Sequence, residues 1–171
     1  MTKHYKHIVH IFTAKGGDNM KLKDKFGIKG HVKLVLKDKN GKVKQVVEGK
    51  NTITALLDAQ VADQMSDQGV AAIGYMGLGT GSGQTSASTG LAASSANVAL
   101  DSTTQGAGAA DNDVVYVATF PAGTATAAIT EAGIFQADNN TTLMAYDDFD
   151  VINKGALDSI VATWVVSFGA S

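Results

Sequence analysis

Residues 30–50 read GHVKLVLKDKNGKVKQVVEGK, and this stretch decides the fold class. Apolar and polar residues alternate over residues 30–37, which is the period of a β-strand that buries one face. The pair Asn40-Gly41 separates this run from a second one, and Asn-Gly between alternating runs is typical of a β-hairpin. The sequence therefore predicts strands over residues 30–37 and 42–50 joined by a type I′ turn, in which both central residues take positive φ.

The predicted hairpin has one apolar and one basic face. The outward face carries Lys33, Lys37, Lys42 and Lys44. Lysines on an exposed strand discourage pairing with the edges of other sheets. We therefore expect the hairpin to lie at the surface with these lysines in solvent.

One later segment, residues 54–68, has helical periodicity. Its apolar stripe consists of Leu57, Val61 and Met65. Residues at this spacing lie on one face of a helix. Thr52 or Thr54 can supply the N-cap, and Gly69 stands at the C′ position. We predict that this helix covers an end or a face of the sheet structure.

The rest of the chain consists of short apolar segments separated by Gly-rich or Asn-rich turns. The segments predicted as strands are residues 73–78, 97–104, 113–120, 128–136, 142–149 and 159–168. We expect Trp164, on the last of these strands, to be buried. The connection between the first two is nearly low-complexity, and we interpret it as a long loop over the surface. Many short strands at this spacing are typical of a β-sandwich. We therefore predict an all-β fold: an antiparallel, jelly-roll-like β-sandwich over residues 30–171 with one short helix, preceded by an extended N-terminal arm over residues 1–29.

Charge is divided unevenly along the 171 residues. Residues 1–50 hold thirteen of the fourteen lysines and four acidic residues, which gives a formal charge of +9. Residues 51–171 hold one lysine and twelve acidic residues, a formal charge of −11. A basic arm on an acidic body indicates that the arm docks on acidic protein surface, such as that of a neighbouring copy. Nucleic acid is the weaker alternative, because the chain has no Arg and few aromatic residues to stack on bases.

The arm is expected to contact its partners through its lysines and the apolar and histidine residues near them. The candidate assembly contacts are Lys21, Lys23, Lys25, Lys29, Phe26, His7 and His10. A segment of this composition cannot bury itself. A small fold without disulfides often gains stability by association, so we expect a homo-oligomer or a larger assembly.

No group of residues indicates catalysis. The chain has no Cys, which excludes a Cys nucleophile and a thiolate zinc site. The glycine-rich run over residues 77–83 lacks the Lys-Ser/Thr pair of a P-loop, and Gln84 stands at the last glycine position of a dinucleotide-binding fingerprint. Glu131 lies in a predicted strand, where it could pair with Lys154 or line a cleft. A lone carboxylate without a partner acid or base is weak evidence for an enzyme.

Two patterns resemble metal sites without completing them. His4, His7 and His10 recur every third residue, but a strand would scatter them over both faces. The acidic segments over residues 111–113 and 147–150 lack the glycine and glutamate of an EF-hand loop, so we interpret them as solvated turn residues. The sequence therefore predicts a protein that is not an enzyme, with no catalytic residues, metal site or cofactor.

Several motifs together resemble a known family. They are KNTIT at residues 50–54, LGTG at 78–81, VATFPAGT at 117–124, AITEAGIF at 128–135 and VINKG at 151–155. Over about residues 20–169 the chain resembles a family of small structural proteins from tailed phages, variously labelled virion structural, decoration or tail-fibre proteins. The resemblance implies a virion protein without catalytic residues, with the major capsid protein or other virion proteins as partners.

Two positions in the virion fit this resemblance. A capsid decoration (cement) protein would clamp its arm on the shell, whereas a tail, fibre or baseplate component would use the arm for attachment. The single domain and the absence of coiled-coil heptads favour the capsid. A carbohydrate-binding module is a remote alternative, which would need exposed aromatic residues. Neither a signal peptide nor a membrane-spanning stretch is predicted, so we expect a soluble protein made in the host cytoplasm.

Overall fold

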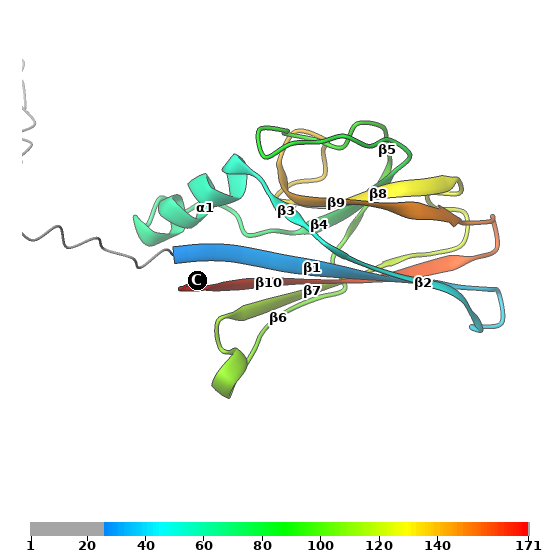
Figure 1. Ribbon diagram of the computed structural model, residues 1–171, viewed down its shortest axis with the longest axis horizontal. Coiled ribbons are helices and arrows are strands. Elements are labelled where there is room, and N and C mark those ends of the chain that lie inside the picture. The colour runs from blue at the N-terminus through cyan, green and yellow to red at the C-terminus, as the bar shows by residue number, and fades with distance from the viewer. Residues whose placement is uncertain (1–25, 171) are drawn as a thin grey trace, which may run out of the picture.

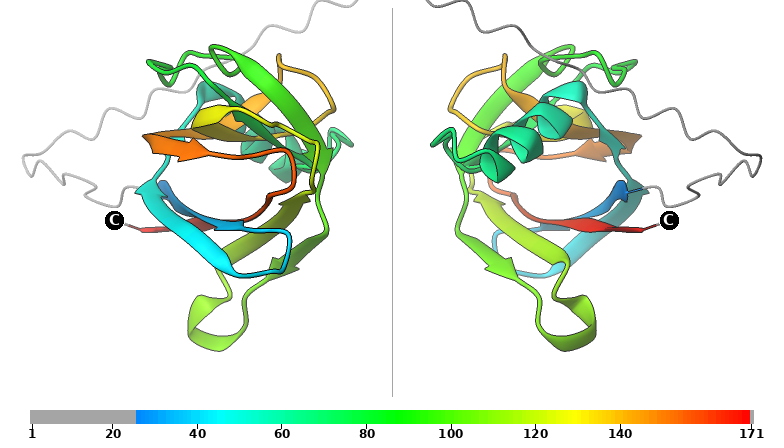
Figure 2. Two further views of the ribbon diagram at one scale, coloured as in Figure 1. Left: turned by 90° about the vertical axis from the view of Figure 1, so that its right-hand side faces the viewer. Right: turned by 90° about the vertical axis from the view of Figure 1, so that its left-hand side faces the viewer.

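The computed structural model describes residues 26–170, which form two five-stranded antiparallel sheets packed face to face (Figure 1). One α-helix, α1 (Ala55–Met65), lies at one end of the two layers, as the end-on views of Figure 2 show. The structure confirms the predicted all-β antiparallel sandwich with one short helix.

The two sheets draw strands from both halves of the chain. The first has the order β2-β1-β10-β7-β6 and the second the order β3-β9-β8-β4-β5. The strands of the first sheet are β1 (Phe26–Lys37), β2 (Val43–Lys50), β6 (Ser102–Gln105), β7 (Asp113–Phe120) and β10 (Ser159–Ala170). Those of the second sheet are β3 (Thr52–Ile53), β4 (Tyr75–Gly79), β5 (Ser94–Ala99), β8 (Ala128–Phe135) and β9 (Leu143–Asn153). A short 3₁₀ helix (Gly108–Ala110) precedes β7.

The longest strand pair joins the two ends of the described chain. β1 and β10 run antiparallel from Phe26 opposite Ala170 to Lys37 opposite Ser159. Residues 26–29, which the sequence analysis placed in the arm, are therefore the start of β1. The pair occupies the interior of the first sheet, with β2 on one side and β7 on the other.

The prediction of one strand over residues 97–104 is wrong, because the chain changes sheets inside this segment. β5 belongs to the second sheet and β6 to the first. At the crossing, the Leu100 amide donates to the Gly74 carbonyl (3.0 Å) and the Asp101 amide to the Val117 carbonyl (2.7 Å). Both amides thus have a hydrogen-bond acceptor at the point where the chain changes sheets.

The turn of the first hairpin also differs from the prediction. Gly41 has a φ of +80°, but Asn40 has no positive φ, so the turn is not type I′. The Gly41 amide donates to the Asp38 carbonyl at 2.9 Å, which fits a type I turn followed by a glycine bulge. The Asp38 carboxylate stabilises this form, because its Oδ1 accepts hydrogen bonds from the amides of Asn40 (2.8 Å) and Lys42 (3.0 Å).

Helix α1 begins near its predicted start and ends earlier than predicted. Thr54 is the N-cap residue, but its hydroxyl donates to backbone carbonyls of β9 instead of accepting from helix amides. Leu57 is buried, whereas Met65 at the last turn is 85% exposed. Asp67 takes a positive φ directly after the helix, so Gly69 is not its C′ residue. Among residues 26–170, no helix is long and apolar enough to cross a membrane.

The main core lies between the sheets, where alternate residues of the central strands point inward. Its members from β1 and β10 are Val32, Leu34, Leu36, Ile160, Ala162, Trp164 and Val166. Trp164 is fully buried, and its neighbours across the strands are Val32 and Tyr116. The structure thus confirms the predicted burial of Trp164 on the last strand.

We predict that Trp164→Ala lowers the free energy of unfolding by about 3–5 kcal/mol, because a fully buried indole would be replaced by a cavity. Urea unfolding monitored by circular dichroism measures the change. Thr163→Ala, at the neighbouring and only half-buried position, is the control and should cost far less. Tryptophan emission typical of solvent exposure in the native protein would contradict the assignment.

Candidate functional site

Glu131, the carboxylate that the sequence analysis singled out, is fully buried in β8. Its oxygens accept hydrogen bonds from the backbone amides of Gly81 (2.8 Å), Ala92 (3.0 Å) and Ala93 (2.8 Å). A carboxylate that receives several amide hydrogen bonds is well stabilised without a cationic partner. Glu131 therefore holds a segment of backbone in place.

The amides that Glu131 binds belong to residues 80–93, the connection between β4 and β5, which we call the anchored loop. The Gln84 side chain donates a further hydrogen bond to the same carboxylate. Gly81 lets the loop approach closely, since a Cβ built there would lie 2.8 Å from Glu131 Oε1. An amide of the Gly-rich run thus donates a hydrogen bond to a carboxylate of the protein itself, where an amide of a P-loop would bind a phosphate.

A small apolar cluster lies beneath the anchored loop. Its buried members are Leu91, Phe135, Leu143 and Tyr146. The loop between β8 and β9 adds a polar clamp, because the Asn140 side chain accepts from the Leu91 amide (2.8 Å) and donates to the Leu91 carbonyl (2.9 Å). The anchored loop is therefore packed onto the second sheet, as Figure 1 shows above β8 and β9.

The alternative that Glu131 pairs with Lys154 is wrong. Lys154 is 2% exposed, and its Nζ donates to the carbonyls of Pro121 (2.9 Å) and Asp158 (2.7 Å). Burial lowers the pKa of the Lys154 ammonium. The Asp158 carboxylate accepts from Lys44 Nζ at 2.6 Å, and this hydrogen bond lowers the pKa of Asp158. Lys154 and Asp158 thus stabilise the turn before β10.

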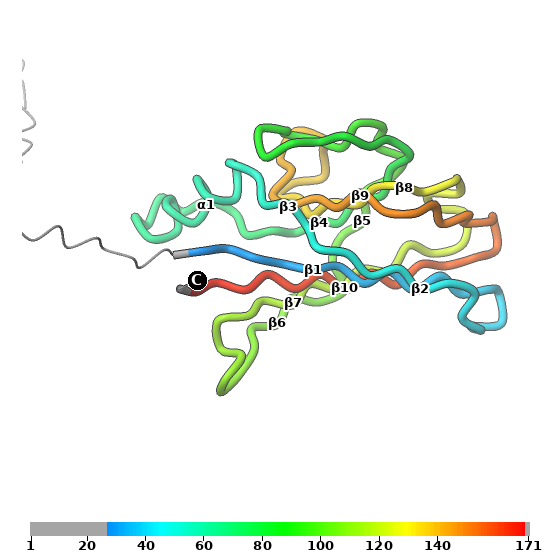
Figure 3. Tube along the Cα trace, viewed as in Figure 1, coloured from blue at the N-terminus to red at the C-terminus, as the bar shows by residue number. Residues whose placement is uncertain are grey.

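Strands β2 and β3 form a nearly continuous segment that passes from the first sheet to the second (Figure 3). Each is the edge strand of its sheet. β3 pairs with β9 at two positions only, Thr52 opposite Tyr146 and Ile53 opposite Ala145. Among the described residues, β9 beyond Tyr146 therefore has β8 on one side and no strand on the other.

A groove lies between β2 and the unpaired part of β9, and we call it the β2–β9 groove. It has a volume of about 720 Å³ and is lined by Gln45, Val46, Val47, Glu48 and Gly49 from β2 and by Asp147, Asp148, Phe149 and Asp150 from β9. Gln45 Nε2 donates to the Val151 carbonyl at 3.1 Å and links the two strands. The interpretation of residues 147–150 as turn residues is wrong, because all four belong to β9.

Asp147 is the buried carboxylate of this groove. It is 7% exposed, and its Oδ2 has no hydrogen-bond partner within the described part of the chain. Gly49 makes the position possible, since a Cβ there would overlap Asp147 Oδ2. Burial raises the pKa of the Asp147 carboxyl to about 6, and the charge of Asp148 adds to the rise. At neutral pH the groove therefore contains a desolvated negative charge.

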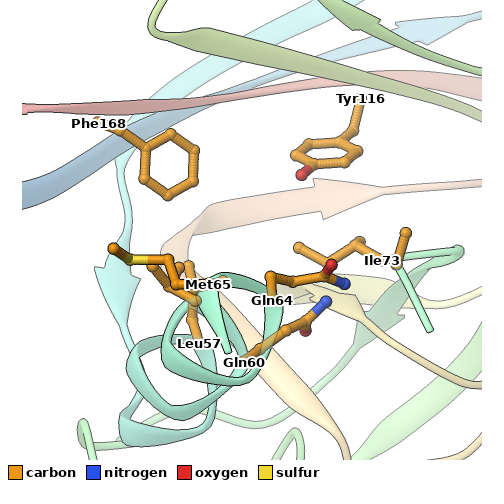
Figure 4. Close-up of a pocket in the computed structure, with 9 residues that line it drawn as sticks. Leu57, Gln60, Gln64, Met65, Ile73, Tyr116 and Phe168 are labelled. Carbon is orange, nitrogen blue, oxygen red and sulfur yellow. The ribbon is translucent and has the colours of Figure 1, made fainter. Parts of the chain in front are cut away.

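A second cavity, of about 400 Å³, lies between α1 and the first sheet (Figure 4). It is lined by Leu57, Gln60, Val61, Gln64, Met65, Ala72, Ile73, Tyr116 and Phe168. Figure 4 shows the rings of Tyr116 and Phe168 facing the side chains of α1 across the cavity. Burial raises the pKa of the Tyr116 hydroxyl. The lining is mainly apolar and contains no pair of acid and base groups that could transfer a proton.

Only two of the seven predicted assembly contacts lie among the described residues. His7, His10, Lys21, Lys23 and Lys25 lie outside the described residues, as does His4. Phe26 and Lys29 belong to β1, opposite Ala170 and Ser167 of β10, and Lys29 is exposed. Within residues 26–170, no three His, Asp or Glu side chains are grouped so that they could hold a metal ion. The β2–β9 groove was not predicted, and the acidic run over residues 147–150 is the sequence feature that marks it.

Comparisons of the chain with protein-family models, curated proteins and solved structures gave no match.

We predict that Glu131→Gln destabilises the anchored loop. The amide would replace one acceptor oxygen with a donor that faces backbone N–H groups, at a cost of about 2–4 kcal/mol. Hydrogen exchange of the amides of residues 81, 92 and 93, together with urea unfolding, measures the loss. Glu48→Gln, at an exposed carboxylate, is the control. Unchanged protection of these three amides would contradict the anchoring role.

We predict that Asp147→Asn stabilises the isolated protein at neutral pH. The folded-state pKa of about 6 lies above the unfolded value, so stability is fully present below about pH 4 and falls as pH rises through about 6. Asparagine does not ionise, and the variant should exceed the wild type by about 1–3 kcal/mol above pH 7.

Urea unfolding at about pH 4 and about pH 7.5 tests this difference at low protein concentration. The exposed Asp150→Asn is the matched control and should show little of this pH dependence. Equal stabilities of wild type and Asp147→Asn at both pH values would show that Asp147 is solvated in the native protein.

Proposed function

We propose that the protein is a non-enzymatic structural protein of a tailed-bacteriophage virion, and that it decorates the capsid through its basic N-terminal arm. The observation that carries this proposal is the division of charge along the chain. Residues 1–25 hold six lysines and two aspartates, a formal charge of +4. Residues 26–170 hold eight lysines and fourteen acidic residues, a formal charge of −6. Opposite charges on two parts of one chain favour attachment to neighbouring subunits in an array.

The basic character of the arm continues onto the outer face of the first sheet. The inward residues of β1 form the core, and Lys29 and Lys33 alternate with them on the outside. Lys42 and Lys44 of the hairpin are exposed, as expected from the sequence, whereas Lys37 is half-buried. Lys33 and Lys44 are paired with Glu48 and Asp158, so Lys29 and Lys42 are the outward lysines of β1 and the hairpin that could contact an acidic partner.

The roles of the buried ionisable side chains support a structural function. Glu131 holds the anchored loop, and Lys154 and Asp158 hold the turn before β10. A catalytic acid or base must instead keep an atom within reach of a substrate. The remaining buried carboxylate, Asp147, lies in a groove bordered by strand edges, which is a setting for binding a chain.

The alternative is a component of the tail, fibre or baseplate. The anchored loop favours this alternative, because it presents small polar side chains on the outside of the second sheet, where a receptor could contact them. Its exposed polar residues include Thr80, Ser82, Thr85 and Ser86. Quantitative mass spectrometry of purified particles separates the two positions: hundreds of copies indicate the capsid and a few copies indicate the tail.

We predict that a protein lacking residues 1–25 keeps its fold and loses binding to particles, because β1 and the core remain complete. Co-sedimentation with particles stripped of the protein measures binding, and circular dichroism monitors folding. Binding of the full chain should weaken as salt is raised from about 0.15 M to about 1 M, where the Debye length falls from about 8 to about 3 Å. Retained binding of the truncated protein would overturn attachment through the arm.

A further inference from the structure

The β2–β9 groove combines acidic side chains, a few apolar side chains and two strand edges at one place. We propose that it receives the lysine-bearing segment over residues 21–25 of a second copy of the chain. This inference rests on the proposed structural function and names a partner for it. Each copy would then offer a groove to one neighbour and a basic segment to another.

The groove has an excess of negative charge that the described residues do not balance. Its lining includes Glu48, Asp147, Asp148 and Asp150 and no lysine. The two ion pairs within the described residues join Lys33 to Glu48 and Lys44 to Asp158, so the three aspartates of the groove take part in neither. The Asp148 carboxylate accepts a hydrogen bond from the Gly83 amide at 2.8 Å, so a cationic partner would find chiefly Asp147 and Asp150 available along the β9 wall.

The lining suits a lysine side chain better than a metal ion. Val47 and Phe149 provide apolar contact for the methylene stem, and the ammonium group at its end can donate hydrogen bonds to carboxylates. A lysine ammonium would stabilise Asp147 most among these carboxylates, because Asp147 is buried and its Oδ2 has no hydrogen-bond partner within residues 26–170. A metal ion would need several converging ligands, and no such group exists among the described residues.

The walls of the groove also suit an extended chain. β2 is the edge strand of the first sheet, and β9 beyond Tyr146 lacks a neighbour on the groove side in the described structure. Strand edges bind extended segments through their main-chain groups. Residues 21–25 read KLKDK, so an extended segment would present its three lysines on one side at intervals of about 7 Å.

The length of the chain indicates that the segment comes from another copy. Glu48 lies opposite Lys33 in β1, seven residues and about 23 Å along the strand from Phe26. Lys25 and Lys23 precede Phe26 by one and three residues, so their Cα atoms can lie at most about 4 and 11 Å from it. The segment as a whole cannot reach the groove of its own subunit. A groove on one copy and a segment on the next form a head-to-tail contact, which builds rings or extended arrays.

A complementation experiment with two charge-reversed proteins tests the proposal. The groove variant carries Glu48→Lys and Asp150→Lys, both at exposed positions, and the segment variant carries Lys21→Glu, Lys23→Glu and Lys25→Glu. Sedimentation velocity of the full chains at low salt should show oligomers for the wild type and at least about tenfold weaker association for each variant alone. An equimolar mixture should regain association, because each segment then meets a groove of opposite charge.

The control for net charge is Asp111→Lys with Asp138→Lys, which makes the same charge change at exposed positions outside the groove. It should associate like the wild type, and thermal unfolding should show that every variant is folded. A monomeric wild type, a groove variant that associates normally, or a mixture that stays dissociated would overturn the proposal.

Particle binding distinguishes this proposal from the function on which it rests. If the groove variant binds particles fully but does not regain association in the complementation test, the virion function stands. The groove is then not the receptor for residues 21–25. If the wild-type protein does not bind particles, this result counts against the virion function itself, whether or not the protein forms oligomers.

Discussion

The pairing of β1 with β10 is the constraint on which the rest of the fold depends. Twelve residues at each end of the described chain align from Phe26 opposite Ala170 to Lys37 opposite Ser159, and they place Trp164 beside Val32 in the core. Because the pair is central in its sheet, β2 can add only on one side and β7 only on the other. This long-range contact forms late in a growing chain, so the sandwich is complete only when its final strand is present.

A second constraint, the buried Glu131 carboxylate, organises the outer side of the second sheet. The composition of residues 80–93 is typical of a linker, yet three amides of this segment bind one carboxylate and Leu91 packs beneath it. Small residues are needed for this arrangement, because a side chain at Gly81 would meet Glu131. The glycines and alanines that look like low complexity in the sequence are therefore requirements of close packing around a charge.

The parts of the fold that depend on local pattern could be predicted from the sequence. The strand over residues 113–120 and the burial of Trp164 follow from alternation, and the structure has both. The failures involve hydrogen-bond partners that periodicity does not show, local in one case and non-local in the others. Asp38 selects the hairpin turn through its own side chain, and the crossing near Leu100 depends on carbonyls of two different sheets. The partners of Glu131 lie about fifty and forty residues before it, at Gly81 and Ala92, so spacing alone could not reveal them.

The β2–β9 groove arises from the same kind of non-local constraint. β3 follows β2 directly but pairs with the second sheet at only two positions, so the rest of β9 keeps an open edge. Two choices at this edge oppose stability: glycine at position 49 weakens a strand, and Asp147 places a carboxylate where an apolar side chain would pack. Gly49 and Asp147 each lower stability alone. Asp147 requires Gly49, because only glycine leaves room for the carboxylate. Paired departures from the rules that stabilise a fold are expected where a surface serves binding, and this groove differs in that respect from the cavity beside α1, whose lining is mainly apolar and contains no carboxylate.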